Sequence, residues 1–346
     1  MSDSAPDSAQ SLLHVSMPPH IRQSESVPSI MLSVILALVP ALAASVVFFG
    51  GYALLLVSVC IAAAAGSEAL LCVLFRKPVT TGDLSAVLTG FLLALTLPPR
   101  LPLWMAAAGS VFAIVVVKMA FGGLGHNFAN PALAGRAFLM VSFPAAMSSW
   151  TAPAHGTLCG LQRGLDGISA ATPLVYFKSV MASGIFNSLD LQDALPSLFW
   201  GNVGGSLGAT SAVAIGVGAV FLFYRGIIRF RTPFFFITTV FLLFWIFNGT
   251  GDIFSAESLI AALYQVLCGG IMLGAFFFAA DPVTSPMSTT GRILFGIGCG
   301  AFTFIIRKFG GYPDGVCWAI LIMNLMVPIL DRYTRPRRFG QVKKHG

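Results

Sequence analysis

Long apolar runs follow one another through most of this sequence, and they constrain its fold more than any other feature. In the whole chain 56% of the residues are apolar and 10% are charged, against about 25% charged in an average soluble domain. Polar side chains are therefore too few to cover a soluble fold of this length. We expect the apolar runs to face a lipid bilayer and the chain to be a polytopic membrane protein.

A helix that crosses a bilayer needs about 20 apolar residues. Hydropathy windows predict about ten such segments, in two groups of five on either side of a polar gap. The predicted fold class is therefore an all-α polytopic membrane protein with about ten transmembrane helices. The expected segments lie near residues 29–49, 52–75, 84–97, 102–121, 131–147, 206–224, 233–248, 259–279, 293–306 and 315–331.

Positive charge predicts the orientation of these segments, because cytoplasmic loops retain Lys and Arg. The tail after Tyr333 is basic, and with ten crossings Arg76, Lys77 and Arg229 fall on the same side as this tail. We therefore predict that both termini are cytoplasmic and that the polar gap, residues 148–205, is periplasmic. The formal net charge of +7 then reflects topology, so we expect no binding to nucleic acid.

Gly and Pro clusters end several of the apolar segments, some of which are short for a full crossing. Broken helices persist at membrane depth only where protein or a cavity satisfies the freed backbone groups. The breaks therefore predict a buried site inside the fold. The clusters are Leu97-Pro98-Pro99, Gly122-Gly123-Leu124-Gly125 and Gly310-Gly311-Tyr312-Pro313-Asp314-Gly315.

The two groups of segments also resemble each other weakly, since residues 112–125 can be laid on residues 302–315 with a small gap. Five crossings in each half would make the repeats inverted, an arrangement that usually places a ligand site between the halves. The predicted parts are a cytoplasmic N-terminal arm (1–28), a first five-helix repeat (29–147), a periplasmic loop (148–205), a second five-helix repeat (206–332) and a basic cytoplasmic tail (333–346).

The most informative motif lies in the polar gap and reads Asp166-Gly167-Ile168-Ser169-Ala170-Ala171-Thr172. By itself it is typical of a polar loop with residues that cap a helix. It also resembles the acceptor signature Asp-x-x-Ser/Thr-Gly-Ala-Thr/Ser, at whose last hydroxyl a flavin transferase attaches FMN by a phosphoester bond; here Ala170 replaces the Gly. The resemblance implies FMN on Thr172, with Asp166, Ser169 and Ala171 in the recognition sequence.

Three further stretches are similar to one family, formed by the D subunit of the Rnf electron-transport complex and the B subunit of the sodium-pumping NADH:quinone reductase. The resemblance covers about residues 30–340 and implies two inverted five-helix halves, similar to urea transporters, in the bacterial inner membrane. The stretches are Gly82 to Pro99, Gly122 to Pro131 (GGLGHNFANP), and Gly310 to Asp314 (GGYPD) followed by Asp331 to Pro336.

The same resemblance implies a function. Members of this family pass electrons through covalent FMN in an ion-translocating oxidoreductase of the ferredoxin:NAD⁺ class and couple them to the movement of Na⁺ or H⁺. The implied partners are the other Rnf subunits, notably a covalently flavinylated G-type subunit and iron–sulfur membrane subunits, and a flavin transferase for maturation. We expect this chain to act as one subunit of that enzyme, without a complete active site or a metal centre of its own.

A second flavin, noncovalent riboflavin, is implied by the motif Gly-His-Asn-Phe-Ala-Asn-Pro, in which Asn127 and Asn130 correspond to residues near the riboflavin of a family member. Amide side chains can donate to and accept from the edge of a flat heterocycle. Helix capping before Pro131 explains the same residues equally well, and both roles are compatible. Arg136, within an apolar segment, is a candidate for contacting a flavin carbonyl or phosphate.

Ionisable residues inside apolar segments are the candidates for an ion path, because charge is costly there. Glu68 lies among small residues in the second segment and suits a cation or proton site. Lys118 can extend its ammonium to the cytoplasmic surface along its apolar stem. The rival carboxylates Asp83, Asp281 and Asp314 each lie beside a break, where we expect them to cap exposed backbone N–H groups.

A different class of protein remains compatible with the architecture. Inverted repeats and broken helices are equally typical of a solute channel or secondary transporter without a redox role. The Thr172 motif separates the two interpretations, because a transporter has no use for a flavin acceptor. A third interpretation, a structural assembly subunit, would apply if Thr172 were never modified, and the Ala170 substitution is the one feature that favours it.

Overall fold

The computed structural model describes residues 26–76, 80–151, 153, 172–183, 188–247, 254–312 and 314–335, and within these ranges the regular structure is helical, with no strand. A first group of helices precedes the long polar gap. It contains α1 (Val27–Phe49), α2 (Tyr52–Leu74), the short helix η1 (Thr81–Asp83), α3 (Ser85–Thr96), α4 (Leu103–Phe112) with its π-helical continuation η2 (Ala113–Met119), α5 (Pro131–Ser142) and α6 (Pro144–Met147).

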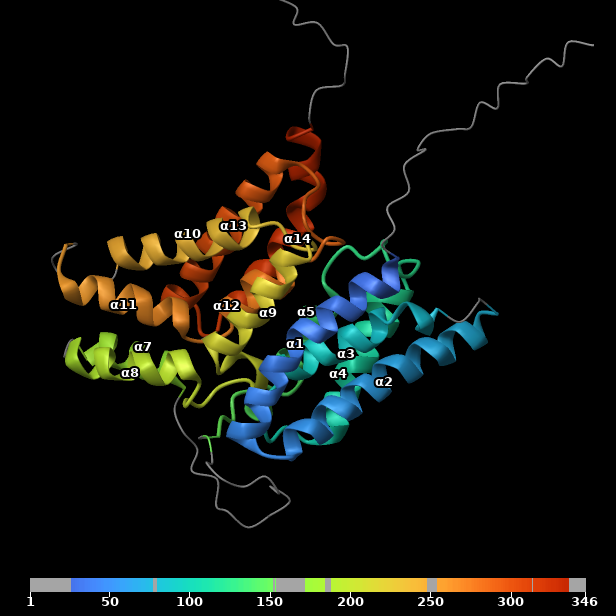
Figure 1. The fold of residues 1–346 in the computed structure, drawn as a ribbon, viewed down its shortest axis with the longest axis horizontal. Coiled ribbons are helices and arrows are strands. Elements are labelled where there is room, and N and C mark those ends of the chain that lie inside the picture. Colours follow the sequence, from blue (N-terminus) through green and yellow to red (C-terminus); the bar gives the residue numbers. More distant parts are fainter. Residues whose placement is uncertain are drawn as a thin grey trace, which may run out of the picture.

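A second group follows the gap, and Figure 1 shows the two groups as separate bundles that meet along α1, α5, α9 and α14. Each of the expected apolar segments contains a helix of one of the two groups. The second group contains α9 (Ala212–Tyr224), α10 (Arg231–Phe247), α11 (Ala256–Leu267), α12 (Ile271–Leu273) with its π-helical continuation η4 (Gly274–Phe278), α13 (Thr289–Phe309) and α14 (Val316–Tyr333).

The helices fit a polytopic membrane protein. Among the described residues, α1, α2, α13 and α14 are each long and apolar enough to cross a bilayer, and α11 with α12–η4 makes a fifth candidate bent by 61°. Large apolar side chains also lie exposed on the outer faces, where lipid satisfies them. Shorter apolar helices complete the two bundles: Ser85–Thr96, Leu103–Met119, Pro131–Ser142, Ala212–Tyr224 and Arg231–Phe247.

The predicted breaks coincide with helix ends. Helix α3 ends at Thr96 before the two prolines, and Gly122, Gly123 and Gly125 all have positive φ angles between 90° and 113°, which a residue with a Cβ rarely adopts. A further break, which the hydropathy pattern did not predict, separates α11 from α12 at residues 268–270. Gly269 has a φ of 68° there, and the bend between α11 and α12–η4 interrupts the helix at this point.

Two helices lie in the segment that the sequence suggested was a polar loop. They are α7 (Pro173–Ser183) and α8 (Ser188–Trp200), and they lie beside α11 in Figure 1. Leu174, Phe177 and Leu198 are buried against Tyr264 of α11 and form a small apolar cluster with it. The few apolar residues of the gap are thus enough to attach it to the second bundle.

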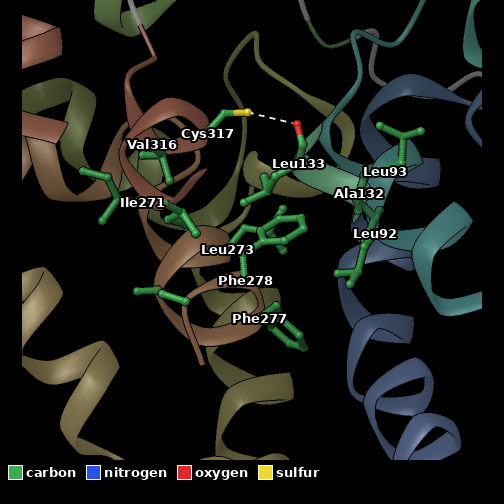
Figure 2. Packing of buried hydrophobic residues seen from close by; sticks show 14 of the residues in the cluster. Leu92, Leu93, Ala132, Leu133, Ile271, Leu273, Phe277, Phe278, Val316 and Cys317 are labelled. Carbon is green, nitrogen blue, oxygen red and sulfur yellow. Dashed lines mark hydrogen bonds between the residues drawn. The ribbon is translucent and has the colours of Figure 1, made fainter. Parts of the chain in front are cut away.

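The core between the two bundles is built from side chains of α3, α5, α12–η4 and α14. Figure 2 shows Leu92, Leu133, Phe277 and Cys317 among the residues that meet there. The Cys317 thiol donates a hydrogen bond to the Leu133 carbonyl at 3.3 Å, across 184 residues of sequence. Close packing at this junction fixes α5 against α14, and both helices begin at breaks.

Candidate functional site

A partly open cavity lies where α5, the start of α7, the break after α11 and the start of α14 meet. Arg136 of α5 and Thr172, directly before α7, both line it, together with Gly270 at the break and Asp314 before α14. The structure therefore brings the predicted flavin acceptor Thr172 and the predicted flavin contact Arg136 to one cavity. Both side chains are largely buried, with exposed fractions of 7% and 5%.

Thr172 is held in place by the helix that it starts. Its hydroxyl accepts a hydrogen bond from the Val175 N–H at 3.3 Å, and its carbonyl accepts one from the Tyr176 N–H at 2.9 Å. The Tyr264 hydroxyl of α11 donates to the Pro173 carbonyl at 3.1 Å, which ties this helix start to the second bundle. A capped helix start that packs on α11 thus sets the position of the hydroxyl.

Arg136 and Arg307 share one carboxylate at the wall of this cavity. The Arg136 Nη2 lies 3.1 Å from the Asp314 Oδ2, and the Arg307 Nη2 lies 3.6 Å from the Asp314 Oδ1. Two guanidinium groups and one carboxylate leave an excess of positive charge. The buried Arg136 Nε also has no hydrogen-bond partner in the described part of the chain. The arrangement suits an anionic or carbonyl oxygen as a further acceptor.

Arg307 also fixes the break between α11 and α12. Its Nη1 donates to the Gln265 carbonyl at 2.7 Å and to the Gln265 Oε1 at 3.0 Å, and its Nη2 donates to the Cys268 carbonyl at 3.1 Å. These carbonyls belong to the end of α11, where no further helical turn supplies donors for them. An arginine of α13 therefore satisfies backbone groups that a broken helix would leave unpaired within the membrane.

The three carboxylates that we expected to be caps behave differently from one another. The prediction is confirmed for Asp83, which accepts from the Ser85 N–H at 2.8 Å, and for Asp281, which accepts from the Val283 N–H at 3.2 Å. It is wrong for Asp314, because the cap of α14 is Gly315 and the Asp314 carboxylate turns to the two arginines. Two buried guanidinium groups need a counter-charge more than one helix end needs a cap.

A second, partly open cavity lies between the two bundles and is lined by residues of α1, α3, η2, α5, α9 and η4. Its wall is mostly apolar and includes Leu92 and Phe277. The polar side chains that line it are Ser85, Thr89, Lys118, Asn127, Asn130 and Asp281. An apolar cavity with a few convergent polar groups is the usual form of a small-molecule site.

The two candidate asparagines have different surroundings in this cavity. Asn130 is the N-cap of α5, with its Oδ1 accepting from the Ala132 and Leu133 N–H groups at 3.1 and 3.4 Å and its Nδ2 donating to Asp281 at 3.3 Å. The capping interpretation is thus confirmed for Asn130. Asn127 lines the same cavity with a buried Oδ1 that has no hydrogen-bond partner in the described ranges.

Glu68 and Lys118 form an ion pair in the interior. The Lys118 Nζ lies 2.8 Å from each Glu68 carboxylate oxygen and 2.6 Å from the Ser85 Oγ, and the side chains of Lys118 and Glu68 are 2% and 0% exposed. The expectation that Lys118 reaches the cytoplasmic surface is wrong. A carboxylate within reach inside the bundle satisfies the ammonium better than the longer path to water.

The remaining predicted flavin residues, Asp166, Ser169 and Ala171, lie outside the described residues, as does Ala170. Thr172 is thus the residue of the motif that lies within the described ranges. The two cavities contain the other candidates, and Glu68 adjoins the second cavity through Lys118.

Comparison with known proteins identifies the family. A family model described as NQR2, RnfD, RnfE matches residues 14–340 of the chain, which is nearly its whole length. The chain belongs to the NQR2, RnfD, RnfE family.

Individual members of the NQR2, RnfD, RnfE family match along almost the whole chain. The D subunit of the Na⁺-translocating ferredoxin:NAD⁺ oxidoreductase complex of Acetobacterium woodii is 42% identical over 96% of this chain and 96% of its own length. The D subunit of the proton-translocating ferredoxin:NAD⁺ oxidoreductase complex of Clostridium ljungdahlii is 41% identical over 96% and 97%. The D subunit of an ion-translocating oxidoreductase complex of Escherichia coli is 37% identical over 96% and 99%.

Local sequence patterns missed several polar contacts that the structure places near the two cavities. Arg307 and Gln265 at the break were not identified, because they lie in different helices and only the fold brings them together. The link from Lys118 to Glu68 was missed for the same reason, although both residues are singled out by their charge. The one available signal was their position, because charged residues inside apolar segments usually have a buried partner.

Proposed function

We propose that this chain is the membrane-embedded D subunit of an ion-translocating ferredoxin:NAD⁺ oxidoreductase and carries FMN covalently on Thr172. FMN accepts and donates electrons singly or in pairs, so it supplies the redox chemistry, while this chain supplies attachment, orientation and surrounding charge. The proposal rests chiefly on one observation: Thr172 and Arg136 line one cavity, and both residues are largely buried.

The residues around Thr172 fit such a group. Gly204, Gly205 and Gly270 form part of the wall, so no side chain fills the space there. The unpaired Arg136 Nε and the excess positive charge around Asp314 favour an electron-rich or anionic group. Reduction that adds negative charge would be stabilised at this wall.

The names of the relatives support the proposed class of enzyme but differ in the translocated ion. The A. woodii relative is named for sodium and the C. ljungdahlii relative for protons, and they are 42% and 41% identical to this chain. Similarity alone therefore does not choose between Na⁺ and H⁺. Within this chain we assign the ion path to the neighbourhood of Glu68, which is the fully buried carboxylate at the edge of the second cavity.

We further propose two inverted five-helix halves with both termini in the cytoplasm and the Thr172 segment in the periplasm of the inner membrane. The contacts of α5 with α14 support the inversion. A shift of 184 residues relates Leu133 to Cys317, which touch each other, and also relates Asn130 to Asp314, which each precede one of the two helices. Such self-matching contacts are expected where a two-fold axis passes between equivalent helices.

Noncovalent riboflavin is the proposed ligand of the second cavity. Its flat ring would suit a mostly apolar wall with amide groups at the edge. Asn127 supports this assignment, because its buried Oδ1 lacks a partner among the described residues and can accept a hydrogen bond from a ring N–H. Asn130 would donate less freely, since its Nδ2 is already bonded to Asp281.

The protein requires partners for electron flow. We propose the covalently flavinylated G-type subunit as the neighbour on the Thr172 side, iron–sulfur membrane subunits on the lateral faces, and a flavin transferase during maturation. The relatives are named as subunits of multi-subunit complexes, which supports this assignment in its general form. The alternative function, a solute channel or transporter, would use the same cavities without flavin.

The decisive experiment is flavin fluorescence of the purified chain, co-expressed with a flavin transferase, after a denaturing gel. We expect fluorescence in the native protein and in Thr172→Ser, which keeps a hydroxyl, and none in Thr172→Val. Thr210→Val is the matched control, because Thr210 lines the same cavity and is also buried. A dark native protein would contradict the proposal and favour the solute channel or transporter. Equal fluorescence in Thr172→Val would contradict attachment to Thr172 and place the covalent flavin on another residue.

A further inference from the structure

The Lys118 ammonium lies in a cage of oxygen atoms inside the first bundle. Its three N–H donors go to the two Glu68 carboxylate oxygens and the Ser85 hydroxyl. The Thr80 hydroxyl donates to the same Glu68 Oε1 at 2.6 Å. Behind Ser85, the Asp83 carboxylate accepts from the Ser85 hydroxyl at 2.5 Å and from its N–H at 2.8 Å.

The cage has an outer side and an inner side. Thr80 is exposed and Asp83 is half-buried, so this part of the cage meets the surface of the protein. Ser85 and Lys118 line the second cavity, so the opposite part meets the interior. Glu68, which is 0% exposed, lies between them. The Lys118 ammonium thus occupies a polar connection between the surface and the second cavity.

We propose that this cage is a binding site for a monovalent cation, and that the Lys118 ammonium is a tethered occupant that the cation replaces. Hydroxyl and carboxylate oxygens are the ligands that hard cations such as Na⁺ prefer. One positive charge on Lys118 balances one negative charge on Glu68. A monovalent cation that takes the place of the ammonium leaves the charge of the cage itself unchanged, whereas a divalent cation would leave an excess there that is costly to bury.

The position of Lys118 permits this exchange. It belongs to η2, a π-helical stretch, and such wide turns occur frequently at functional positions. Its side chain already borders the second cavity, and the half-buried carboxylate of Asp281 lines the same cavity. An ammonium that turns away from Glu68 therefore enters a space that contains another carboxyl group. Passage of the cation would then depend on the charge inside the second cavity. This inference deepens the ion-translocating function proposed above and rests on it.

Lys118→Met tests the proposal in the full-length chain with its flavin attached, because it removes the tethered cation and keeps the length of the side chain. Thermal unfolding is measured in sodium chloride and in choline chloride at equal ionic strength, and sodium uptake is measured by equilibrium dialysis with radioactive sodium. We expect Lys118→Met to bind sodium and to unfold on the order of 5 °C higher in saturating sodium than in choline. The native protein should show a much smaller difference.

Two further variants test whether the sodium effect requires Glu68 and is specific to Lys118. Glu68→Gln combined with Lys118→Met removes the carboxylate and should lose both the sodium binding and the salt difference. Lys308→Met is the matched control, since Lys308 lies on α13 near its end, and bonds to the Phe247 carbonyl rather than to a carboxylate. It should behave as the native protein does.

The proposal is overturned if Lys118→Met unfolds alike in both salts, if the double variant still binds sodium, or if Lys118→Met fails to fold in sodium while the double variant folds. The last outcome would mean that the cage accepts no cation in place of the ammonium. Flavin fluorescence is recorded in parallel and reports on Thr172 alone. A dark protein that binds sodium would contradict the flavin proposal and leave the cation site standing.

Discussion

The Arg136 guanidinium and the Asp314 carboxylate lie 3.1 Å apart and belong to opposite halves of the chain. Arg136 lies in the second turn of α5, and Asp314 lies just before the start of α14. The ion pair therefore joins the middle of α5 to the start of α14, which α5 contacts. It also forms the wall of the cavity that contains Thr172. The same contact links the two bundles and sets the charge at the wall of the cavity that Thr172 also lines.

Asp314→Asn should lower the stability of the protein strongly. The change leaves two buried guanidinium groups without their counter-charge, and breaking a buried ion pair in this way costs about 3–5 kcal/mol. A thermal unfolding experiment in detergent would show the midpoint falling by several degrees or more. Asp193→Asn is the control, because Asp193 is exposed on α8. Equal midpoints for the two variants would contradict the role of Asp314.

Asn127→Leu should remove a noncovalent flavin and leave the fold intact. The Asn127 Oδ1 has no partner to lose within the described residues, so the substitution sacrifices no hydrogen bond of this oxygen there and adds apolar contact. The measurement is flavin released by acid from purified protein, which leaves the phosphoester-bound FMN in place. Released flavin that stays at the native level would show that Asn127 does not contact the ligand.

Asn130→Ala should destabilise the protein rather than empty the second cavity. Asn130 caps α5 and bonds to Asp281, and losing an N-cap costs about 1 kcal/mol. The unfolding midpoint should therefore fall while released flavin per folded protein stays close to the native value. The reverse pattern, an unchanged midpoint with lost flavin, would assign Asn130 to ligand binding instead of capping.

Gly90→Ala should separate α3 from α2. A Cβ at Gly90 would lie 2.6 Å from the Cys60 carbonyl oxygen, which is backbone and cannot move without moving α2. Gly66→Ala on α2 is the matched control, because a Cβ there meets nothing within 4 Å. We expect the first variant to unfold at a lower temperature, and the second to be neutral or stabilised by roughly 0.5–1 kcal/mol because Ala favours a helix. Similar losses in both would indicate that helix contact is not the cause.

Local patterns predicted much of the helical framework, because an apolar run and a following Gly or Pro cluster are both local. The end of α3 before Pro98 and the cap before Pro131 are examples. The break at Gly269 was missed, since the apolar run from residue 259 to 279 continues through it. Helices α7 and α8 were missed because their few apolar residues are stabilised by α11 rather than by a pattern of their own.

The candidate site was predicted residue by residue but not as an arrangement. Thr172 and Arg136 were each identified, yet only the fold shows that they line one cavity. Asp314 was expected to cap α14, because nothing in its neighbourhood along the chain indicates Arg136, 178 residues away. Lys118 was expected at the surface for the same reason, since its partner Glu68 lies 50 residues earlier. Tertiary packing determines which residues distant in sequence become partners, and local sequence patterns carry no information about that packing.

The apolar outer faces of the helices have a consequence for assembly. Val73 on α2, Val220 on α9 and Leu325 on α14 are among the exposed side chains, with exposed fractions of 67%, 68% and 59%. In a bilayer these faces are already solvated by acyl chains, so covering them with another protein releases little hydrophobic free energy. Neighbouring subunits must then recognise this chain by shape and by scarce polar contacts. Those contacts are expected near the ends of the helices, where the chain leaves the lipid.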